Sequence, residues 1–203
     1  MRKLFISGIG TDVGKTVVSS IVVEKLKADY WKPIQAGDLE LTDTMKVRQL
    51  VSNSKTVFHK EAYKFTNSVS PHYAAALDRI TIDPKNIYLP ISDNDTLVIE
   101  GAGGLMVPLN ENYLIIDLIK DIEAEIILVS NNYLGSINHT LLSIEAIQTR
   151  NLPLIGIIFN GISNPETERI IQMHTGIRCL GQIPNNPEVN KEFVLKCTSL
   201  LTI

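Results

Sequence analysis

The stretch GIGTDVGKT, residues 8–16, is a glycine-rich turn that follows an apolar run and precedes a helical pattern. It ends in Gly14–Thr16, a G-K-T sequence typical of loops that bind nucleotide phosphates. The spacing is unusual, because the standard loop has four residues between its outer glycines. Here five residues separate Gly8 from Gly14, and one of them is the acid Asp12.

The elements predicted around this loop favour phosphate binding. Lys3–Ser7 are predicted to form a strand and Lys15–Ala28 a helix, so backbone N–H groups at the helix start can point at an anion. Lys15 adds a positive charge for the β- and γ-phosphates, and the Thr16 hydroxyl can ligate Mg²⁺. An ordinary strand–turn–helix would not explain a lysine in the first helical turn, where the helix dipole disfavours it. We therefore expect nucleotide binding.

Short apolar runs alternate with helical patterns through the rest of the chain. Several runs are continuous, as in strands that are covered on both faces of a parallel sheet. This alternation predicts an α/β fold in three layers, with a mostly parallel central sheet and helices on both faces, in one domain over residues 1–203. The other predicted strands are Tyr30–Ile34, Thr96–Glu100, Glu125–Ser130, Leu154–Asn160 and Arg178–Ile183, and the other predicted helices are Asp43–Val51, Leu114–Ile122, Ile137–Arg150, Pro165–His174 and a short one in SPHYAAALD, residues 70–78.

Composition limits the classes of function. The 203 residues carry a net charge of −3 with a pI near 5.8, so there is no basic footprint and we do not expect nucleic-acid binding. No apolar run is long enough to span a bilayer, so we do not expect a membrane protein. Cys179 and Cys197 lie far apart without metal-ligand spacing, as expected of reduced thiols in a cytoplasmic protein.

Charged residues follow other predicted strands, where ligands bind in folds of this kind. Glu100 ends an apolar strand and precedes a glycine-rich stretch, residues 101–104; an acid there can hold Mg²⁺, and the glycines let a ligand approach the backbone. Asp43 begins a predicted helix, either as an N-cap or as a metal ligand. Lys32 is either a surface lysine or a second cation for an anionic substrate. Asn138, at the start of another helix, can bind a carboxylate together with the backbone amides there.

Taken together, these stretches resemble the dethiobiotin synthetase family of ATP-dependent enzymes, which have a P-loop NTPase fold. GTDVGKT resembles the family's extended phosphate loop, KPIQAG its K-P-x-x-[ST]-G segment, SPHYAA its S-P-H segment, VIEGAGG its V-E-G-A-G-G segment and LGSINHT its L-G-x-I-N-H segment. IFNG and GQIP fall where the family contacts adenine. The resemblance covers nearly the whole chain.

The resemblance implies that 7,8-diaminopelargonate, CO₂ and ATP with Mg²⁺ give dethiobiotin, ADP and phosphate, through a carbamate and a carbamic–phosphoric anhydride. Lys15 and Lys32 would be catalytic, holding carbamate and phosphate oxygens, and the metal ligands would be Thr16, Asp43 and Glu100. Contacts to the nucleotide and its metal are implied for Asp12, Val13, Gly14, Lys15, Thr16, Val17, Asp43, Glu100, Gly101, Ala102, Gly103, Asn160, Gly161, Pro184, Asn185 and Asn186.

Contacts to the substrate are implied for Thr11, Asp12, Lys32, Ala36, Gly104, Ser136, Ile137 and Asn138. The last three would reach the substrate carboxylate in the neighbouring subunit, which implies a homodimer with its substrate site near the interface. The extra loop residue would let the Asp12 carboxylate face the diamine or a metal-bound water instead of the phosphates, and the alternative is a solvent-facing Asp12. Ala36 departs from the family, which has a serine or threonine there, so one substrate hydroxyl contact is missing.

Three other interpretations fit parts of the pattern. A partitioning or metal-carrier ATPase would carry a second lysine five residues before Lys15, where this chain has Gly10. A carboxylate-activating amidoligase of the cobyrinate type would need an ammonia source or a glutaminase domain, for which we find no room. An inactive paralogue, marked by Ala36, conflicts with the intact set of lysines and acids.

Overall fold

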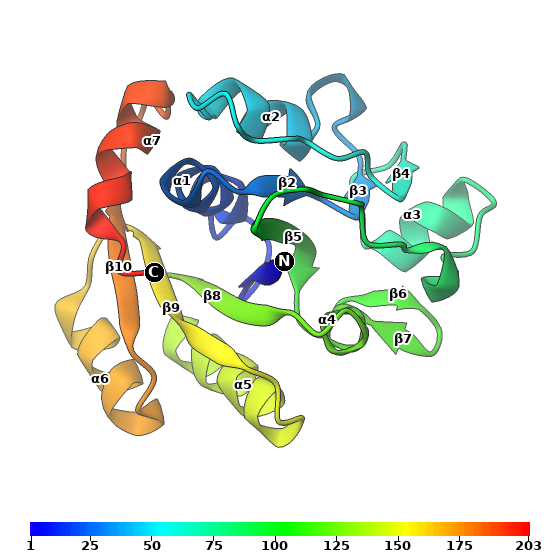
Figure 1. Ribbon diagram of the computed structural model, residues 1–203. Helices are drawn as coiled ribbons and strands as arrows, with labels where there is room; N and C mark the ends of the chain where they lie inside the picture. The colour runs from blue at the N-terminus through cyan, green and yellow to red at the C-terminus, as the bar shows by residue number, and fades with distance from the viewer.

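The computed structural model describes residues 1–203 and contains a central sheet of six parallel strands (Figure 1). In chain order these strands are β1 (Arg2–Gly8), β2 (Asp29–Trp31), β5 (Thr96–Gly104), β8 (Glu125–Asn131), β9 (Leu154–Gly161) and β10 (Cys179–Pro184). Their order across the sheet is β10-β9-β8-β1-β5-β2. The predicted parallel sheet is confirmed.

Helices cover both faces of this sheet, which confirms the three predicted layers. The helices are α1 (Lys15–Leu26), α2 (Asp43–Leu50), α3 (Pro71–Leu77), α4 (Ile115–Asp121), α5 (Ser136–Thr149), α6 (Pro165–Thr175) and α7 (Lys191–Cys197), with 3₁₀ turns at Leu39–Leu41, Pro84–Asn86 and Thr198–Leu200. In Figure 1, α1, α2 and α7 lie above the sheet, and α4, α5 and α6 lie below it.

Alternate residues of the strands pack into different hydrophobic clusters on the two faces of the sheet. Leu4 and Ile6 of β1 belong to the cluster on the α1 face, whereas Phe5 belongs to the cluster that includes the buried residues of α4. Successive side chains of a strand point to opposite faces, so a strand covered on both sides must be apolar at every position. This is the physical reason for the continuous apolar runs in the sequence.

The predicted single strand Tyr30–Ile34 is wrong. Strand β2 ends at Trp31, and β3 (Ile34–Ala36) begins a separate two-stranded sheet with β4 (Tyr63–Phe65). Pro33 lies at the break, where it has no N–H to continue a ladder and its carbonyl instead accepts from the amides of Ala62 and Tyr63. Lys32 therefore lies in the turn between two sheets.

Strand β5 is longer than the predicted Thr96–Glu100. It continues to Gly104, which pairs with Gly8 beyond an irregularity in the β1–β5 register, so Glu100 lies inside the strand and not at its end. The hairpin of β6 (Pro108–Asn110) and β7 (Tyr113–Leu114) follows. The sequence does not predict these two strands or the seven-residue α7, because segments this short show no clear periodicity.

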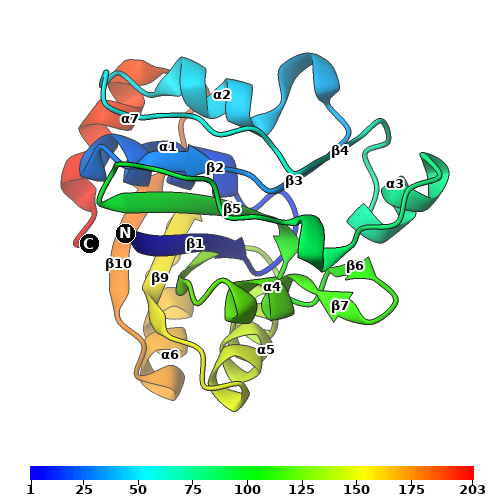
Figure 2. The ribbon, with the colours of Figure 1, turned by 45° about the vertical axis from the view of Figure 1, so that its right-hand side comes forward.

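Figure 2 shows β1 and β5 running side by side, with their carboxyl ends directed towards β3 and the β6–β7 hairpin. The phosphate loop follows β1 at this edge of the sheet. No helix has the length and apolar character needed to cross a membrane. Both cysteines are free thiols, as expected, with Cys197 buried and Cys179 partly exposed.

Candidate active site

A cleft of about 750 Å³ lies at the carboxyl edge of the sheet, between the phosphate loop, the β2–β3 turn, the start of α2 and β5. It brings together eleven of the predicted site residues: Thr11, Asp12, Gly14, Lys15, Thr16, Lys32, Ala36, Asp43, Glu100, Ala102 and Gly103. These residues come from four separate parts of the sequence, which only the parallel sheet places side by side.

The other predicted site residues do not line this cleft. Four of them, Val13, Val17, Gly101 and Gly104, are adjacent in the sequence to residues that line the cleft. The proposed adenine contacts Asn160, Gly161, Pro184, Asn185 and Asn186 follow or end β9 and β10, further along the same edge. The three residues Ser136–Asn138 begin α5, outside the cleft of their own chain.

The phosphate loop is packed against the end of β9. Gly14 has a φ of 91°, and a Cβ at this position would lie 2.1 Å from Nδ2 of Asn160, so only glycine fits. The same Asn160 nitrogen donates to the carbonyl oxygen of Val13 at 3.0 Å. Asn160 thus fixes the turn that leads into α1.

The phosphate loop packs one of its own residues against its first glycine. Val13 is buried in the core on the α1 face, and its Cγ2 would lie 2.6 Å from a Cβ on Gly8. Asp12, one residue earlier, has a φ of 58° and an exposed side chain at the cleft wall. The longer loop folds over Val13 and leaves Asp12 at the surface of the cleft.

Glu100 is the centre of a hydrogen-bond network. Its side chain is about 1% exposed. Oε1 accepts from the Thr16 hydroxyl at 2.9 Å and from Lys32 Nζ at 3.1 Å. Oε2 accepts from the buried Tyr30 hydroxyl at 2.9 Å. Burial of a carboxylate is tolerated here because both oxygens have partners.

Lys32 lies between two carboxylates. Besides Glu100, its Nζ contacts Oδ2 of Asp43 at 2.7 Å. Burial acts to lower the pKa of Lys32, but the charges of Glu100 and Asp43 outweigh burial and raise this pKa above its ordinary value. Lys32 is therefore a buried ammonium paired with two carboxylates, and the surface-lysine alternative is wrong.

Asp43 is the first residue of α2, but it is not the N-cap. Thr42 is the N-cap, and its hydroxyl accepts from the amide of Met45 at 3.3 Å. The Asp43 carboxylate instead contacts Lys32 and, through Oδ1, Lys46 Nζ at 3.2 Å. Burial acts to raise the pKa of Asp43, whereas the two lysines lower it below the ordinary value, so this carboxylate is ionised at neutral pH.

Lys15 is buried at the start of α1, and its Nζ donates to the carbonyl oxygen of Gly10 at 3.0 Å. Burial lowers the pKa of Lys15, Glu100 opposes this decrease, and the neighbouring Lys32 ammonium adds to it. Two cations and two carboxylates thus share one water-restricted site. The charges of these four groups balance, so a ligand with several negative charges would fit this site best together with a cation that pairs with the carboxylates.

Sequence reasoning missed several residues of the site. Gln35 is buried, accepts from the Asp43 amide at 3.2 Å and donates to the Gly37 carbonyl at 3.0 Å, which positions the start of α2. Tyr30 supports Glu100. Ser68 and Ser70 line the cleft along with Ala36. The motif KPIQAG contains Gln35, but nothing in its spacing indicates which backbone groups the side chain meets.

The fold and this cleft define a P-loop nucleotide-binding protein with a second buried cation beside the phosphate loop. The model of the family described as AAA domain matches residues 2–192. ATP-dependent dethiobiotin synthetase BioD of Christiangramia forsetii is 55% identical over 195 residues, which cover 96% of this chain and 93% of that protein. The protein of the same name from Cytophaga hutchinsonii is 48% identical, covering 96% and 94%. The chain belongs to the ATP-dependent dethiobiotin synthetase family.

Solved structures of other ATPases share the fold. The septum site-determining protein MinD of Pyrococcus horikoshii, solved with Mg-ADP, gives a TM-score of 0.61 at 18% identity, over 96% of this chain and 85% of that one. A ParA family ATPase from Chlorobium tepidum gives 0.59 at 13% identity, over 98% and 91%. At such identities the likeness concerns the fold alone.

Proposed function

We propose that this chain is a ligase that closes the ureido ring of dethiobiotin from 7,8-diaminopelargonate and CO₂, with conversion of ATP to ADP and phosphate. The observation that carries the proposal is the pair of buried lysines, Lys15 in the phosphate loop and Lys32 across Glu100, in one cleft. One lysine suffices to hold a nucleotide. A second one is suited to a second anion beside the γ-phosphate.

The chemistry requires positioning and charge neutralisation rather than a covalent nucleophile. One amine of the substrate adds to CO₂ and loses a proton to give a carbamate. A carbamate oxygen attacks the γ-phosphorus of ATP, and ADP leaves. The second amine then attacks the carbonyl carbon of this anhydride and loses a proton, and phosphate leaves as the ring closes. Lys15 and Lys32 are suited to hold the carbamate and phosphate oxygens in these steps.

The residues at the centre of the cleft fit Mg²⁺. Thr16, Asp43 and Glu100 offer only oxygen donors, and Mg²⁺ is commonly held by one or two carboxylates together with phosphates of the substrate. The Lys32 ammonium already lies between the two carboxylates, which indicates that their geometry suits a cation. When bound, Mg²⁺ would neutralise charge on the β- and γ-phosphates.

The remaining proposed contacts divide into those to the nucleotide and those to the substrate. We propose that Asn160, Gly161 and the segment Pro184–Asn186 bind adenine, a proposal supported by the contact of Asn160 with the phosphate loop. Backbone atoms of Val13, Val17, Gly101, Ala102 and Gly103 would surround the phosphates and the metal, whereas Gly104 would contact the substrate. On the substrate side, Thr11, Asp12 and Ala36 would face the diamine.

We also propose that the protein is a homodimer in the cytoplasm, with residues 1–203 of each chain acting as one domain. Ser136–Asn138 lie outside their own chain's cleft, so a second copy is needed if they bind the substrate carboxylate. The exposed apolar side chains of Ile137 itself and of the nearby Leu134 support an interface there.

The direct test is incubation of the protein with diaminopelargonate, bicarbonate and MgATP, followed by detection of dethiobiotin by mass spectrometry. Phosphate release is followed in parallel, with and without the diamine. We expect both products to depend on the diamine. Phosphate release at the same rate without diamine would point instead to a switch ATPase of the kind that shares this fold.

A further inference from the structure

We propose that Tyr30 is a positioning residue that sets the orientation of the Glu100 carboxylate for Mg²⁺. The inference deepens the proposed function and rests on the metal site described there. Tyr30 does not line the cleft and touches neither proposed substrate. It acts through Glu100 alone.

The two oxygens of Glu100 have different partners. Oε1 lies on the cleft side, within hydrogen-bond distance of the Thr16 hydroxyl and Lys32 Nζ. Oε2 is held from behind by the Tyr30 hydroxyl at 2.9 Å, in a fully buried contact. Oε1 is therefore directed towards the proposed metal ligand Thr16. Oε2 is occupied by Tyr30 on the opposite side.

The position of Tyr30 is fixed on both edges of its strand. In the β2–β5 register Tyr30 pairs with Val98, two residues before Glu100, so all three side chains lie on the same face of the sheet. On the outer edge, the Tyr30 amide donates to Val57 and the Tyr30 carbonyl accepts from His59, both at 2.9 Å. The ring packs against Phe58, with centroids 6.2 Å apart. The hydroxyl is thus presented by a rigid frame.

Removing this hydroxyl would leave Oε2 of Glu100 buried without a partner. A buried, unpaired carboxylate oxygen is costly, so the carboxylate would turn towards its remaining donors and leave the orientation that suits the metal. Loss of a group that orients a metal ligand typically weakens metal affinity or activity by about 10–100-fold. A neutral phenol is also the proper donor here, because it adds no charge that would repel Mg²⁺.

The test compares Tyr30→Phe with the parent protein by calorimetric titration of ATP, once with Mg²⁺ varied and once in EDTA. Mg²⁺ should strengthen ATP binding in both proteins. We expect the Mg²⁺ concentration that gives half of this effect to be about 10–100-fold higher for Tyr30→Phe than for the parent. We expect ATP affinity in EDTA to stay unchanged, since Tyr30 lies outside the nucleotide contacts. The melting temperature without ligands reports whether the fold is intact.

Two variants serve as controls. Tyr113→Phe removes a phenol–carboxylate hydrogen bond of the same type, to Asp121 at 2.6 Å, outside the cleft. It should leave both titrations unchanged. Phe58→Leu loosens the packing of the Tyr30 ring but keeps its hydroxyl. It should lower the melting temperature without the large shift in Mg²⁺ dependence.

The outcomes separate this proposal from the metal site itself. If Glu100→Gln changes the Mg²⁺ dependence but Tyr30→Phe does not, the positioning role of Tyr30 is wrong and the metal site stands. If neither variant changes it, Glu100 does not bind the metal. Equal losses of ATP affinity in Mg²⁺ and in EDTA, the same shift in Phe58→Leu, or an unfolded Tyr30→Phe protein would assign the hydroxyl to the fold and overturn the proposal.

Discussion

At the scale of single residues, Lys32 is notable because its ammonium occupies the space between the two carboxylates proposed to bind Mg²⁺. Its ammonium contacts Asp43 at 2.7 Å and Glu100 at 3.1 Å, the two carboxylates proposed as Mg²⁺ ligands. A lysine and a divalent cation cannot both occupy the space between these oxygens. Binding of the metal with ATP should therefore release Lys32 towards the second anion, where the proposed chemistry needs it.

This competition gives a prediction for Lys32→Gln. Turnover should fall by about 100-fold or more, as expected when a group that stabilises transition-state charge is removed. In the absence of nucleotide, Mg²⁺ should raise the melting temperature of the variant more than that of the parent, because two buried carboxylates then lack their counter-ion. Lys46→Gln is the matched control, since Lys46 contacts Asp43 from a more exposed position. Equal Mg²⁺ responses in all three proteins would refute the competition.

Ala36 is the second residue with a distinct expectation. The structure places it on the cleft wall beside Ser68 and Ser70, and Ser68 Oγ lies 1.8 Å from the place of a Cβ on the adjacent Gly37. Ser68 is therefore a candidate for the hydroxyl that a serine or threonine supplies at position 36 in the family.

We predict that Ala36→Thr lowers the KM for the diamine, or raises the rate, by up to about ten-fold. A hydrogen bond to an ionised group contributes about 1.5–3 kcal/mol, part of which water in the cleft can supply. The KM for ATP should stay the same. Steady-state kinetics with the two substrates varied separately test this. If Ala36→Thr changes nothing and Ser68→Ala raises the diamine KM, Ser68 already fills the role.

Some site residues could be predicted from the sequence and some could not. Lys15 and Thr16 lie in a motif whose backbone geometry is local, and the structure places both in the cleft. The helix cap is different: Thr42 and Asp43 are both good cap residues, and only the position of Lys32 decides which one caps and which one faces the site. The role of Tyr30 could not be predicted, because an apolar pattern indicates that a residue is buried but not which group its hydroxyl contacts.

At the scale of elements, the longer strands and helices of the central fold could be predicted because each is long enough to show its pattern. The break at Lys32–Pro33 could not, since the apolar run continues through it and only the pairing of β3 with β4 separates the two sheets. Strand β2 is three residues long, and its outer edge is covered by the segment 57–59 rather than by a strand.

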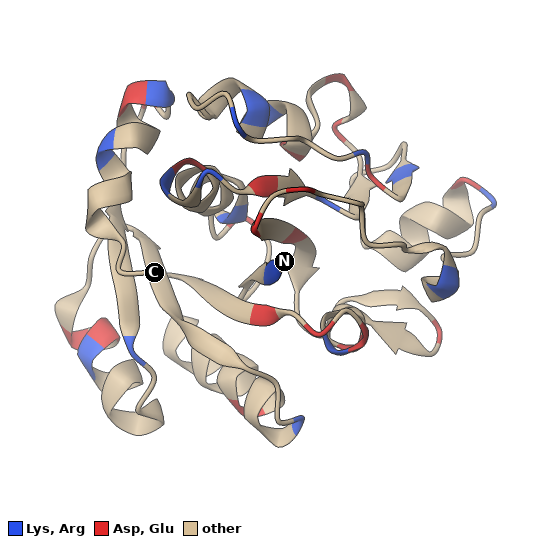
Figure 3. Cartoon of the chain, in the orientation of Figure 1, with Lys and Arg blue, Asp and Glu red and all other residues tan.

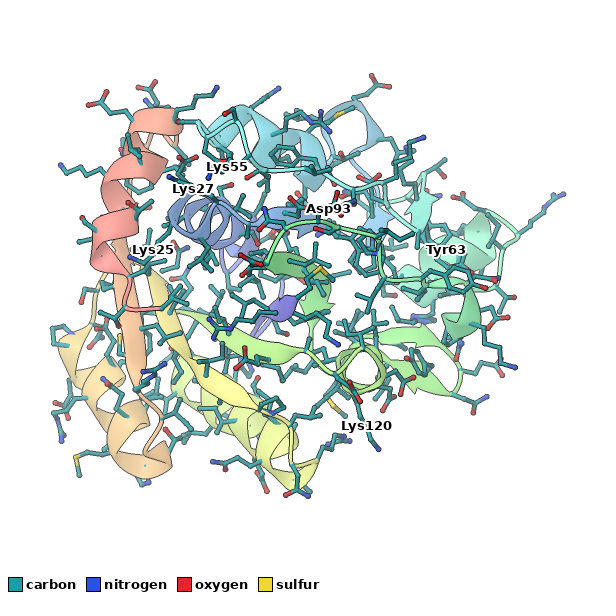
Figure 4. The ribbon with its side chains drawn as sticks, viewed as in Figure 1. Lys25, Lys27, Lys55, Tyr63, Asp93 and Lys120 are labelled. Atoms are coloured by element: carbon teal, nitrogen blue, oxygen red, sulfur yellow. The ribbon has the colours of Figure 1, made fainter.

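A single carboxylate attaches this edge to the surrounding loops. The buried Asp29, at the start of β2, accepts from the Val57 amide, the Ser92 hydroxyl and the side chain of Asn94, and it also contacts His59 at 3.1 Å. These loops border a second depression, of about 660 Å³, whose rim includes Lys27, Lys55 and Asp93 (Figure 4). Asp29 therefore holds β2 in place, and β2 carries the Tyr30 hydroxyl that donates to Glu100.

The pKa of Asp29 predicts how this anchor depends on pH. Burial acts to raise the pKa, but the hydrogen bonds from Ser92, Val57 and His59 outweigh it and lower the pKa below the ordinary value of 3.8. A carboxylate with a lowered pKa in the folded state stabilises the fold above its unfolded pKa, and this contribution disappears as pH falls through the folded pKa. The contribution is therefore present at neutral pH and fades below about pH 3.8.

Asp29→Asn should accordingly destabilise the protein by about 1.5–3 kcal/mol at pH 7, through weakened hydrogen bonds to a charged acceptor. The difference from the parent should shrink as the pH is lowered below 4. Urea unfolding at a series of pH values measures it. Asp93→Asn, at an exposed carboxylate nearby, should change little at any pH. A destabilisation of Asp29→Asn that is independent of pH would mean that shape, and not charge, matters at this position.

At the scale of the whole molecule, charge does not single out a docking face. Figure 3 shows acidic and basic segments interspersed over helices and loops, in keeping with a net charge of −3. Apolar side chains are more informative. Tyr133, Leu134 and Ile137 at the start of α5 are exposed, and so is Ile162 beyond β9, whose carbonyl accepts from Asn132. These side chains form an uncovered apolar surface around the start of α5.

We predict that Leu134→Asp separates the proposed homodimer. Leu134 is fully exposed in the single chain, so the charge costs little in the fold of one subunit, but it would be buried and unpaired if a second copy covers it. Light scattering should give a dimer mass for the parent and a monomer mass for the variant. Ile91→Asp is the control, because Ile91 is equally exposed and lines the second depression, away from α5. Since Ser136–Asn138 would reach the partner's cleft, the variant should also bind the diamine more weakly while ATP binding in its own cleft persists. A parent protein that is monomeric at working concentration, yet fully active, would show that these residues do not complete a neighbour's site.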